Sequence, residues 1–413
     1  MKISVYYARK LMSIEIPDEN IGDVLSPNDF QAESFDIIME TGLRNPFNSI
    51  ELKRFLDSKS EILFIVNDAS RPTPTQKILS SIKDELDSIH YKFLVATGAH
   101  KAPDESELEF IFGDNLDNFR ERIFIHDCYH QKQMEYVGIT GRGTEISLNQ
   151  LFFRADKIVI IGSVEPHYFA GYTGGRKSIL PGIASYKTIE QNHSLALSAN
   201  SKSLSLKGNP IHEDIMEAMT LLNKPIFSIQ AVLGKSGQIY SISCGDLVES
   251  FTAAIKSAKR IYSVKATLKS DIVIAVAHYP MDKNFYQSQK AIENGKLILK
   301  KNGILILVSQ CRDGIGPKKF YDLLAAHCKP EEIITHIEKE YVLGYHKSYK
   351  MAEIQTHSQI WAVSDLDSLT LEQIRIRQFE SLQKAIDNAL EIEGTSARIS
   401  ILHDACNTVP NLV

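Results

Sequence analysis

One stretch of the sequence gathers several reactive side chains: Gly162–His193, which reads GSVEPHYFAGYTGGRKSILPGIASYKTIEQNH. It holds two histidines, His167 and His193, and a glycine cluster around Lys177. Glycine backbone N–H groups beside a lysine are typical of loops that bind phosphate. Histidines bind metal ions or move protons near neutral pH. The stretch is therefore predicted to bind a phosphate-bearing cofactor and to hold the reacting groups.

The glycine cluster resembles a P-loop but departs from its pattern. Arg176 stands where a P-loop has the glycine before its lysine, and Pro181 follows too soon for a continuing helix. Anion binding is therefore favoured over ATP hydrolysis, and a tight packing turn is the alternative. For Lys177 three roles stay open on residue type alone: phosphate contact, surface cation and covalent anchor.

Further polar residues follow two strand-like runs. Asp68 and Arg71 lie in NDASRPTP after EILFIV, and His100 lies in VATGAHK after YKFLVA. Asp68 and Arg71 form either an ion pair that braces a turn or a site where Arg71 holds a substrate carboxylate. The histidines at 100, 167 and 193 form a metal site, an acid/base pair or merely satisfied polar groups, and spacing does not choose among these.

The elements that must position these residues alternate between strands and helices, which is typical of an α/β fold with mostly parallel sheets. In such sheets ligands bind beyond the carboxyl ends of the strands. Asp68, Arg71, His100 and His167 all fall at such ends, so we expect them to share one site. The predicted strands are 61–66, 91–96, 157–161, 271–277 and 303–308, and the principal predicted helices are 74–89, 104–112, 246–264, 286–300 and 371–391.

A chain of 413 residues exceeds what one core usually serves, so two domains are expected. We place an N-terminal α/β catalytic and cofactor-binding domain at 1–265 and a C-terminal α/β domain at 266–413. The last strand, about 397–413, is allowed to pack back on the N-terminal domain. The two domains are expected to be closely apposed, with the active site in the cleft between them.

The composition is that of a soluble globular protein, with 43% hydrophobic and 23% charged residues. A net charge of −5 without a Lys/Arg block argues against nucleic acid as a partner. The N-terminus has no signal-peptide pattern, and no run approaches the ~18 apolar residues of a membrane span. Five scattered cysteines without CxxC suit a reducing cytoplasm.

Five segments together resemble the nickel-pincer lactate racemase family in order and approximate spacing, and the resemblance covers nearly the whole chain. They are NDASRPTP, VATGAHK, HYFAGYTGGRKSILPGIASYKTIEQNH, YPMDKNFYQSQK and QCRDGIGPKKFY. Departures such as Ser70, Lys101 and Tyr172 remove no chemical role but leave the substrate open.

The resemblance implies a role for each matched residue. Its members hold a nickel-pincer nucleotide, pyridinium-3-thioamide-5-thiocarboxylic acid mononucleotide, with nickel bound through one carbon and two sulfurs. Lys177 is then the covalent thioamide anchor, His193 the nickel ligand, and His100 and His167 the acid/base pair. The other expected contacts are Thr173, Gly174 and Gly175 with the cofactor, and Asp68, Arg71, Tyr286, Gln287 and Lys290 with the substrate.

The implied chemistry agrees with these residue types. The C2–H of a 2-hydroxy acid is a poor acid, because its carboxylate disfavours a second negative charge. Removal of C2–H as hydride, while a base takes the hydroxyl proton, leaves a planar 2-oxo acid. Return of hydride to the opposite face inverts the centre, and two faces call for two acid/base groups.

We therefore expect a cytoplasmic isomerase that racemises or epimerises C2 of a 2-hydroxy acid, with lactate as the default substrate. Malate, a longer or aromatic 2-hydroxy acid, and a sugar acid are the alternatives within this class. The alternative from another class is a nucleotide- or phosphate-binding protein without racemase activity. Expected partners are the 2-hydroxy acid and the enzymes that make the cofactor and insert nickel, without nucleic acid or membrane. His346, in GYHKSYK, lies either on a helix surface or behind the site.

Overall fold

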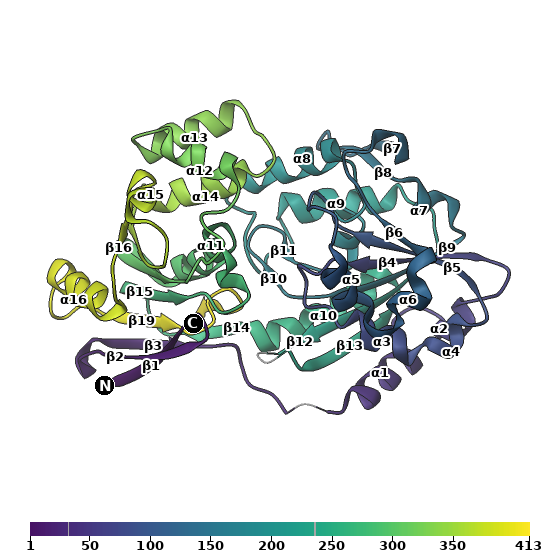
Figure 1. The fold of residues 1–413 in the computed structure, drawn as a ribbon, viewed down its shortest axis with the longest axis horizontal. Helices are drawn as coiled ribbons and strands as arrows, with labels where there is room; N and C mark the ends of the chain where they lie inside the picture. Colours follow the sequence, from purple (N-terminus) through teal and green to yellow (C-terminus); the bar gives the residue numbers. More distant parts are fainter. Residues whose placement is uncertain (32, 235–236) are drawn as a thin grey trace. The chain divides into compact units, whose positions relative to one another are not determined.

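The chain folds into two units, and the computed structural model describes residues 1–31, 33–234 and 237–413 (Figure 1). One unit is continuous, Asp29–Ile261, and the other joins Met1–Asn28 to Tyr262–Val413. The later boundary lies close to the predicted one after residue 265. Residues Met1–Asn28 were predicted to belong to the N-terminal domain, but they belong to the unit that contains Tyr262–Val413.

Strand pairing explains that difference. β3 (Ile21–Leu25) lies in parallel register beside β19 (Ile399–Leu402), which also pairs with β15 (Ser270–Val276). The last strand, β20 (Val409–Leu412), pairs with β14 (Ser263–Ala266). These strands all belong to the unit that holds Tyr262–Val413, so neither end of the chain joins the sheet of the other unit.

The unit Asp29–Ile261 is built on a six-stranded sheet of order β13-β12-β9-β4-β5-β6. All neighbours are parallel except β13, which runs antiparallel to β12. The strands are β4 (Glu61–Asn67), β5 (His90–Ala96), β6 (Ile123–Ile125), β9 (Lys157–Ser163), β12 (Ile226–Leu233) and β13 (Ile239–Gly245), with hairpins β7 (Met134–Ile139)–β8 (Glu145–Asn149) and β10 (Pro166–His167)–β11 (Gly171–Tyr172). The helices are α1 (Phe35–Arg44), α2 (Leu52–Phe55), α3 (Thr75–Ser81), α4 (Lys83–Leu86), α5 (Glu105–Phe112), α6 (Leu116–Phe119), α7 (Gln150–Arg154), α8 (Tyr186–Ser194), α9 (Pro210–Thr220) and α10 (Leu247–Tyr262).

The other unit is built on a fully parallel six-stranded sheet of order β18-β17-β16-β15-β19-β3. The N-terminal hairpin and α16 pack on one hydrophobic core with this sheet. Strands not yet bounded are β1 (Lys2–Tyr7), β2 (Lys10–Glu15), β16 (Leu299–Val308), β17 (Gln359–Val363) and β18 (Ile376–Gln378). The helices are α11 (Phe285–Gly295), α12 (Lys318–Ala325), α13 (Pro330–Lys339), α14 (Tyr345–Gln355), α15 (Ser368–Gln373) and α16 (Leu382–Glu393).

The predicted strands are all present because their apolar runs are buried on both faces, as parallel sheets require. β4, β9 and β15 are buried along nearly their whole length. Three predicted helices were wrong in extent. The helix 74–89 breaks at Ile82, and the helix 286–300 ends at Gly295, before β16 begins at Leu299. The span 371–391 holds two helices separated by β18, after Arg375 adopts a left-handed φ of 62°.

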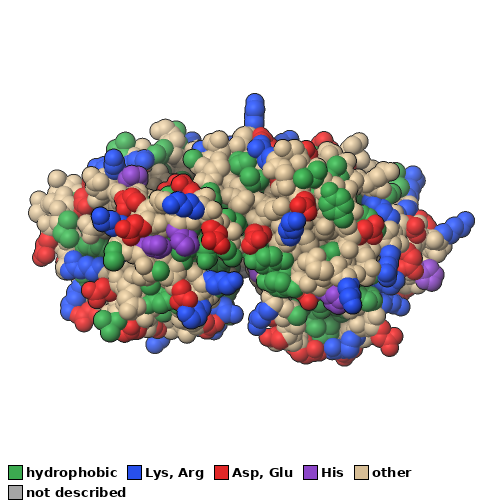
Figure 2. Space-filling model, turned by 90° about the horizontal axis from the view of Figure 1, so that it is seen from above, with side chains coloured by type: hydrophobic (Ala, Val, Ile, Leu, Met, Phe, Trp, Pro, Cys, Tyr) green, Lys and Arg blue, Asp and Glu red, His purple; other side chains and the backbone are tan. Residues whose placement is uncertain are grey.

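Charged side chains of both signs are intermixed over the face seen in Figure 2. Among the residues described, no helix is both long enough and apolar enough to cross a membrane.

Candidate active site

The loops that follow β4, β5 and β9 carry the predicted histidine and carboxylate groups. These three strands are neighbours in the order β9-β4-β5, and their parallel register brings their carboxyl ends to one edge. The backbone N–H of Gly98, after β5, donates to the carbonyl of Gly182 at 2.9 Å, which ties this edge to the glycine-rich stretch. Loops far apart in the sequence therefore meet, as the placement of the residues at strand ends predicted.

Asp68 and His100 form a close pair at this edge. His100 Nδ1 lies 2.7 Å from Asp68 Oδ2, and the Ser70 hydroxyl donates to Asp68 Oδ1 at 2.6 Å. Burial raises the pKa of Asp68, but the hydrogen bond and charge of His100 and the hydroxyl outweigh burial, so this pKa is lowered. The His100 side chain stays 57% exposed, so a small molecule can reach its free edge.

The structure answers the question of the Asp68–Arg71 turn. The backbone N–H of Arg71 donates to the carbonyl of Asp68 at 3.2 Å, which closes the turn. The Asp68 carboxylate accepts its side-chain hydrogen bonds from His100 and Ser70, and the charge of Arg71 helps to lower its pKa. Arg71 is half-buried. The contact that the structure shows for the Asp68 side chain is with His100, and its predicted contact with substrate stays a prediction.

His167, Lys177 and His193 gather around the ring of Phe169. The ring centroids of His167 and His193 lie 4.4 Å and 5.1 Å from that of Phe169. Lys177 Nζ lies 5.2 Å from the same centroid and 3.3 Å from His167 Nε2. All three polar side chains are buried. The two histidines and the lysine of the stretch thus converge on one ring. Phe169 was not among the predicted site residues, although its position between His167 and Lys177 in the sequence was a signal for it.

The elements that hold these three side chains are short and densely bonded. His167 lies on β10, paired with Gly171 of β11, and its Nδ1 accepts the backbone N–H of Ala170 at 3.3 Å. His193 lies in the last turn of α8, which Ser185 caps through the N–H of Thr188. The preceding residue, Asn192, donates to the buried carboxylate of Asp214 at 2.8 Å. The end of α8 is thereby fixed.

Arg176 braces the loop between β10 and Lys177. Its buried guanidinium donates to the carbonyls of Ala170 and Tyr172 at 2.9 Å and 3.2 Å and to His212 Nδ1 at 3.0 Å. It also stacks on Phe251 at 4.3 Å. Burial lowers the pKa of Arg176 to about 9, and burial with the charge of Arg176 lowers that of His212 to about 4. Arg176 is therefore a loop brace, a role not foreseen from the sequence.

Thr173, Gly174 and Gly175 make their visible contacts with the protein itself. The Thr173 hydroxyl accepts the N–H of Glu165 at 2.8 Å, and the N–H of Gly175 donates to Gln230 Oε1 at 2.8 Å. Gly174 has φ +73°, and a Cβ there would lie 2.6 Å from a methyl group of Val164. These contacts support the packing alternative for the glycines, and cofactor binding by the three residues stays a prediction.

In the other unit, Tyr286, Gln287 and Lys290 lie on the first two turns of α11. Asn284 caps this helix by accepting the N–H of Gln287 at 2.9 Å. Lys290 Nζ lies 3.5 Å from Met281 Sδ. The predicted substrate-binding residues therefore share one helix start, as their spacing of three to four residues suggested.

A buried lysine that sequence reasoning missed supports this helix start. Lys347 Nζ donates to the carbonyl of Tyr286 and lies 3.7 Å from the centroid of its ring. Burial and the charge of Lys290 hold the pKa of Lys347 well below its ordinary value, and burial raises the pKa of Tyr286 to about 12. The neighbouring His346 is buried and its Nδ1 lies 2.8 Å from the Tyr341 hydroxyl, so it is not a helix-surface residue.

Within the described ranges, no three or more His, Cys, Asp or Glu side chains lie together as a metal-holding group.

Two family models match the chain in order. The lactate racemase N-terminal domain matches residues 7–204, and the lactate racemase C-terminal domain matches residues 264–409. Together they cover most of the chain, including every residue proposed above for the site.

Individual relatives agree with the models. Lactate racemase from Lactiplantibacillus plantarum is 30% identical, with 98% of this chain and 99% of the relative covered. Lactate racemase from Thermoanaerobacterium thermosaccharolyticum is 28% identical, with 98% of each covered. The apoprotein structure of the latter superposes with a TM-score of 0.93 over the full length of both chains.

A Thermotoga maritima protein, 15% identical, shares the fold with a TM-score of 0.70 over 92% of this chain and 98% of its own. The two family models, the curated relatives and the superposition agree over nearly the whole length. The chain therefore belongs to the lactate racemase family of isomerases.

Proposed function

We propose that the chain interconverts the two configurations at C2 of a 2-hydroxy acid, with lactate as the default substrate. One observation carries the proposal: His167, Lys177 and His193 converge around Phe169, all three buried. The names of the relatives support lactate. Malate, a longer or aromatic 2-hydroxy acid and a sugar acid are the alternative substrates.

The residues present fit a lysine-tethered nickel-pincer nucleotide. The buried amine of Lys177 would hold the group covalently, and His193 would supply the single protein ligand to nickel. A group that brings its own carbon and sulfur donors suits a site where the described residues form no protein metal cluster. Bound there, the nucleotide would supply an electrophilic carbon that takes up and returns the hydride of C2.

The geometry around His167 supports the anchoring role of Lys177. Because His167 Nδ1 accepts the N–H of Ala170, the neutral ring carries its proton at Nε2. Nε2 lies 3.3 Å from Lys177 Nζ, so an unprotonated amine can accept that proton. An unprotonated amine is the form that acts as a nucleophile in a covalent attachment.

Hydrogen bonding supports the acid/base role that we propose for His100. With Asp68 accepting a hydrogen bond from Nδ1–H of His100, Nε2 of the exposed ring is left to take the substrate hydroxyl proton. The resemblance assigns the opposite face to His167. Its Nε2 can take a proton there only when the ring proton lies on Nδ1, which requires release of the Ala170 N–H. Arg71 would pair with the substrate carboxylate, and Tyr286, Gln287 and Lys290 keep the substrate-binding role that the resemblance assigns them.

The proposed partners are the enzymes that build the cofactor and insert nickel, and the proposed compartment is the cytoplasm. The discriminating experiment is the intact mass and metal content of the chain after co-expression with such enzymes. We expect a mass adduct and about one nickel per chain. Lys177→Ala should lose the adduct, whereas Arg54→Ala, an exposed cation elsewhere in the same unit, should keep it. Wild-type protein without adduct or nickel would refute the proposal.

The same preparations test the acid/base assignment. His100→Ala and His167→Ala should retain an adduct yet lose interconversion of the two lactate enantiomers, measured by chiral chromatography. The loss expected for one positioned acid/base group is about 10²-fold to 10⁴-fold. Full activity in either variant would contradict the two-base assignment.

A further inference from the structure

A cavity of about 450 Å³ lies within the unit of residues 1–28 and 262–413, apart from the residues assigned above. This volume falls in the usual range of small-molecule pockets, about 300 to 1,000 Å³. It is lined by Tyr7, Ala8, Arg9, Lys10, Tyr279, Asp282, Gln310, Arg312 and Asp365.

The cavity lies where α/β folds bind ligands. Tyr279 and Asp282 follow β15, Gln310 and Arg312 follow β16, and Asp365 follows β17. These are three adjacent strands of the fully parallel sheet, and the lining residues leave from their carboxyl ends. The turn of the β1–β2 hairpin supplies the remaining wall. Ligands of open α/β sheets bind beyond the carboxyl ends of the strands, and this cavity lies there.

The lining carries more cationic than anionic capacity. Both carboxylates are engaged within the protein: Asp282 Oδ1 accepts from Arg312 at 2.9 Å, and Asp365 accepts from Tyr7 and, at 3.0 Å, from Gln310. Arg9 and Lys10 are exposed at the hairpin turn, and no ion pair joins either to a carboxylate among the residues described. Asp365 keeps its negative charge, because its hydrogen-bond donors Tyr7 and Gln310 are neutral. Arg9, Lys10 and Arg312 against Asp282 and Asp365 leave the lining with one net positive charge, and an anion beside Arg9 and Lys10 would meet that excess.

Tyr279 positions two arginines of the lining. Its ring is half exposed, and the guanidinium carbons of Arg9 and Arg312 lie 4.0 Å and 4.9 Å from its centroid. Stacking of this kind holds the two arginines in place while their edges stay available for hydrogen bonds. The Asp365 carboxylate retains acceptor capacity beyond its two bonds, so it can take a hydroxyl or amino donor.

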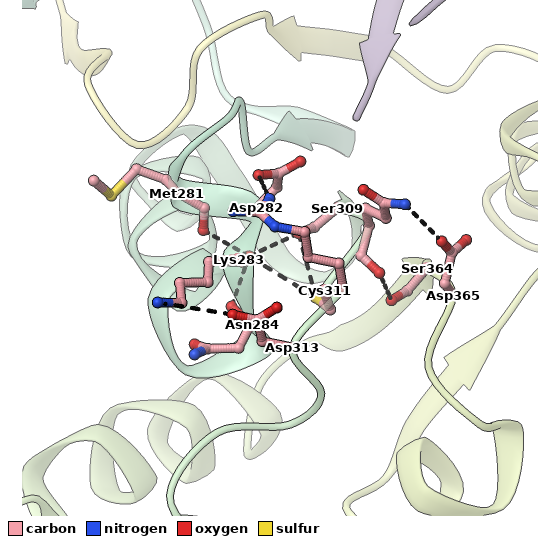
Figure 3. Close-up of polar contacts among 12 residues, drawn as sticks. Met281, Asp282, Lys283, Asn284, Ser309, Cys311, Asp313, Ser364 and Asp365 are labelled. Carbon is pink, nitrogen blue, oxygen red and sulfur yellow. Dashed lines mark hydrogen bonds and ion pairs between the residues drawn. The ribbon is translucent and has the colours of Figure 1, made fainter. Parts of the chain in front are cut away.

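The loop after β16 is held in an unusual conformation beside the cavity. Cys311, between Gln310 and Arg312, has a left-handed φ of 55°, which costs about 1 kcal/mol for a residue with a side chain. Its N–H donates to the carbonyl of Asp282 at 2.9 Å and its thiol to Ser309 at 3.3 Å. Figure 3 shows Cys311 below Asp282 and Ser309, with Ser364 and Asp365 to its right. Gln310 and Arg312 therefore line the cavity from a loop that Asp282 and Ser309 hold through hydrogen bonds to Cys311.

We propose that this cavity binds a small organic oxyanion, a carboxylate or a phosphate ester that also carries a hydroxyl or amino donor. The oxyanion contacts Arg9 and Lys10, which Tyr279 and the hairpin turn hold in place, and the donor meets Asp365. The assignment does not depend on the racemase proposal, because it uses residues outside that site.

The test is calorimetric titration of the full chain with three probes at matched ionic strength: malonate, inorganic phosphate and glycerol phosphate. Sodium chloride at the same ionic strength is the blank. The affinities for malonate and glycerol phosphate show whether the cavity prefers a carboxylate or a phosphate. The difference in affinity between glycerol phosphate and inorganic phosphate measures what the glycerol group, with its hydroxyls, contributes to binding. We expect saturable binding of glycerol phosphate to the wild-type protein, and weaker saturable binding of malonate, which has no donor for Asp365.

Variants assign the binding to the cavity. Arg9→Gln should weaken it at least about tenfold, since a charge-assisted hydrogen bond is lost, and Lys10→Gln should weaken it less. Arg377→Gln is the matched control: this arginine also stacks on aromatic rings in the same unit, at 4.6 Å and 5.1 Å, but does not line the cavity. Unchanged thermal midpoints without anion verify folding.

Three outcomes would overturn the proposal. Arg9→Gln could bind as tightly as the wild type, or the heats for all three probes could equal the chloride blank. Alternatively, binding could be lost in Arg71→Gln and kept in Arg9→Gln, which would move the anion to the candidate active site.

Discussion

At the scale of single residues, the pair of Asp68 and His100 yields the sharpest expectation. Asp68→Asn keeps the shape of the side chain but removes the charge and allows an amide N–H to face Nδ1, which favours the wrong tautomer of His100. We expect interconversion of lactate to fall about 10²-fold, at the lower end of what a positioned acid/base group contributes. Activity of cofactor-loaded protein and the ¹⁵N spectrum of His100 measure the two effects.

Ser70→Ala is the control for that variant, because it removes the other hydrogen bond to Asp68, 2.6 Å long, without changing a charge. A smaller loss of activity and an unchanged His100 tautomer are expected. Equal losses in the two variants would mean that the turn, rather than the carboxylate, is what His100 needs.

Residue chemistry was only partly readable from the sequence. Strand-end positions brought Asp68 and His100 to one edge, but their mutual pairing depends on side-chain geometry that spacing does not encode. Lys177 and His193 received their roles from the resemblance, and their convergence on Phe169 adds a physical reason. Arg176 illustrates the opposite case, since its neighbours in the sequence suggested anion binding whereas its partners are backbone carbonyls.

At the scale of elements, the start of α11 depends on the buried Lys347. Lys347→Met preserves the volume but removes the hydrogen bond to the Tyr286 carbonyl and the cation on its ring. Because Tyr286 and Lys290 are the proposed substrate contacts, we expect KM to rise about tenfold, the equivalent of one hydrogen bond, with a smaller change in kcat. Steady-state kinetics and the thermal midpoint measure the effects.

Lys350→Met is the matched control for Lys347→Met, since Lys350 is equally buried on α14 but faces Glu353 at 3.6 Å. It should change the thermal midpoint more than KM. A KM that rises equally in both variants would show that α14 acts on the substrate site only through general stability.

Elements were easier to predict than their limits. Buried apolar runs located β4, β5, β9, β15 and β16, because both faces of a parallel sheet exclude polar residues. Helical periodicity across 371–391 hid the short β18, since three residues of strand hardly disturb a pattern of period 3.6. The pairing of β3 with β19 was not predictable, because a parallel partner leaves no mark on local sequence.

At the scale of the whole molecule, the unit of Asp29–Ile261 should lose stability in mild acid. Burial lowers the pKa of His126 to about 4, although its bond to the Ala184 carbonyl opposes this, and the pKa of His212 is likewise about 4. The ordinary value is 6.5, so the unfolded chain binds these protons more tightly. Above pH 6.5 both histidines are neutral in the folded and unfolded chain. As pH decreases toward 4 the free energy of unfolding falls, by about 3 kcal/mol for His126.

The variants His126→Asn and His212→Gln isolate this effect. Each variant should be less stable than the wild type at pH 7, because the substitution removes packing contacts. Its free energy of unfolding should nevertheless fall less between pH 6.5 and 4, since one group that gains a proton on unfolding is gone. His130→Asn, an exposed histidine in the same unit, should keep the full slope. Denaturant unfolding followed across this pH range supplies the slope, and a double variant with the wild-type slope would assign the acid sensitivity to other groups.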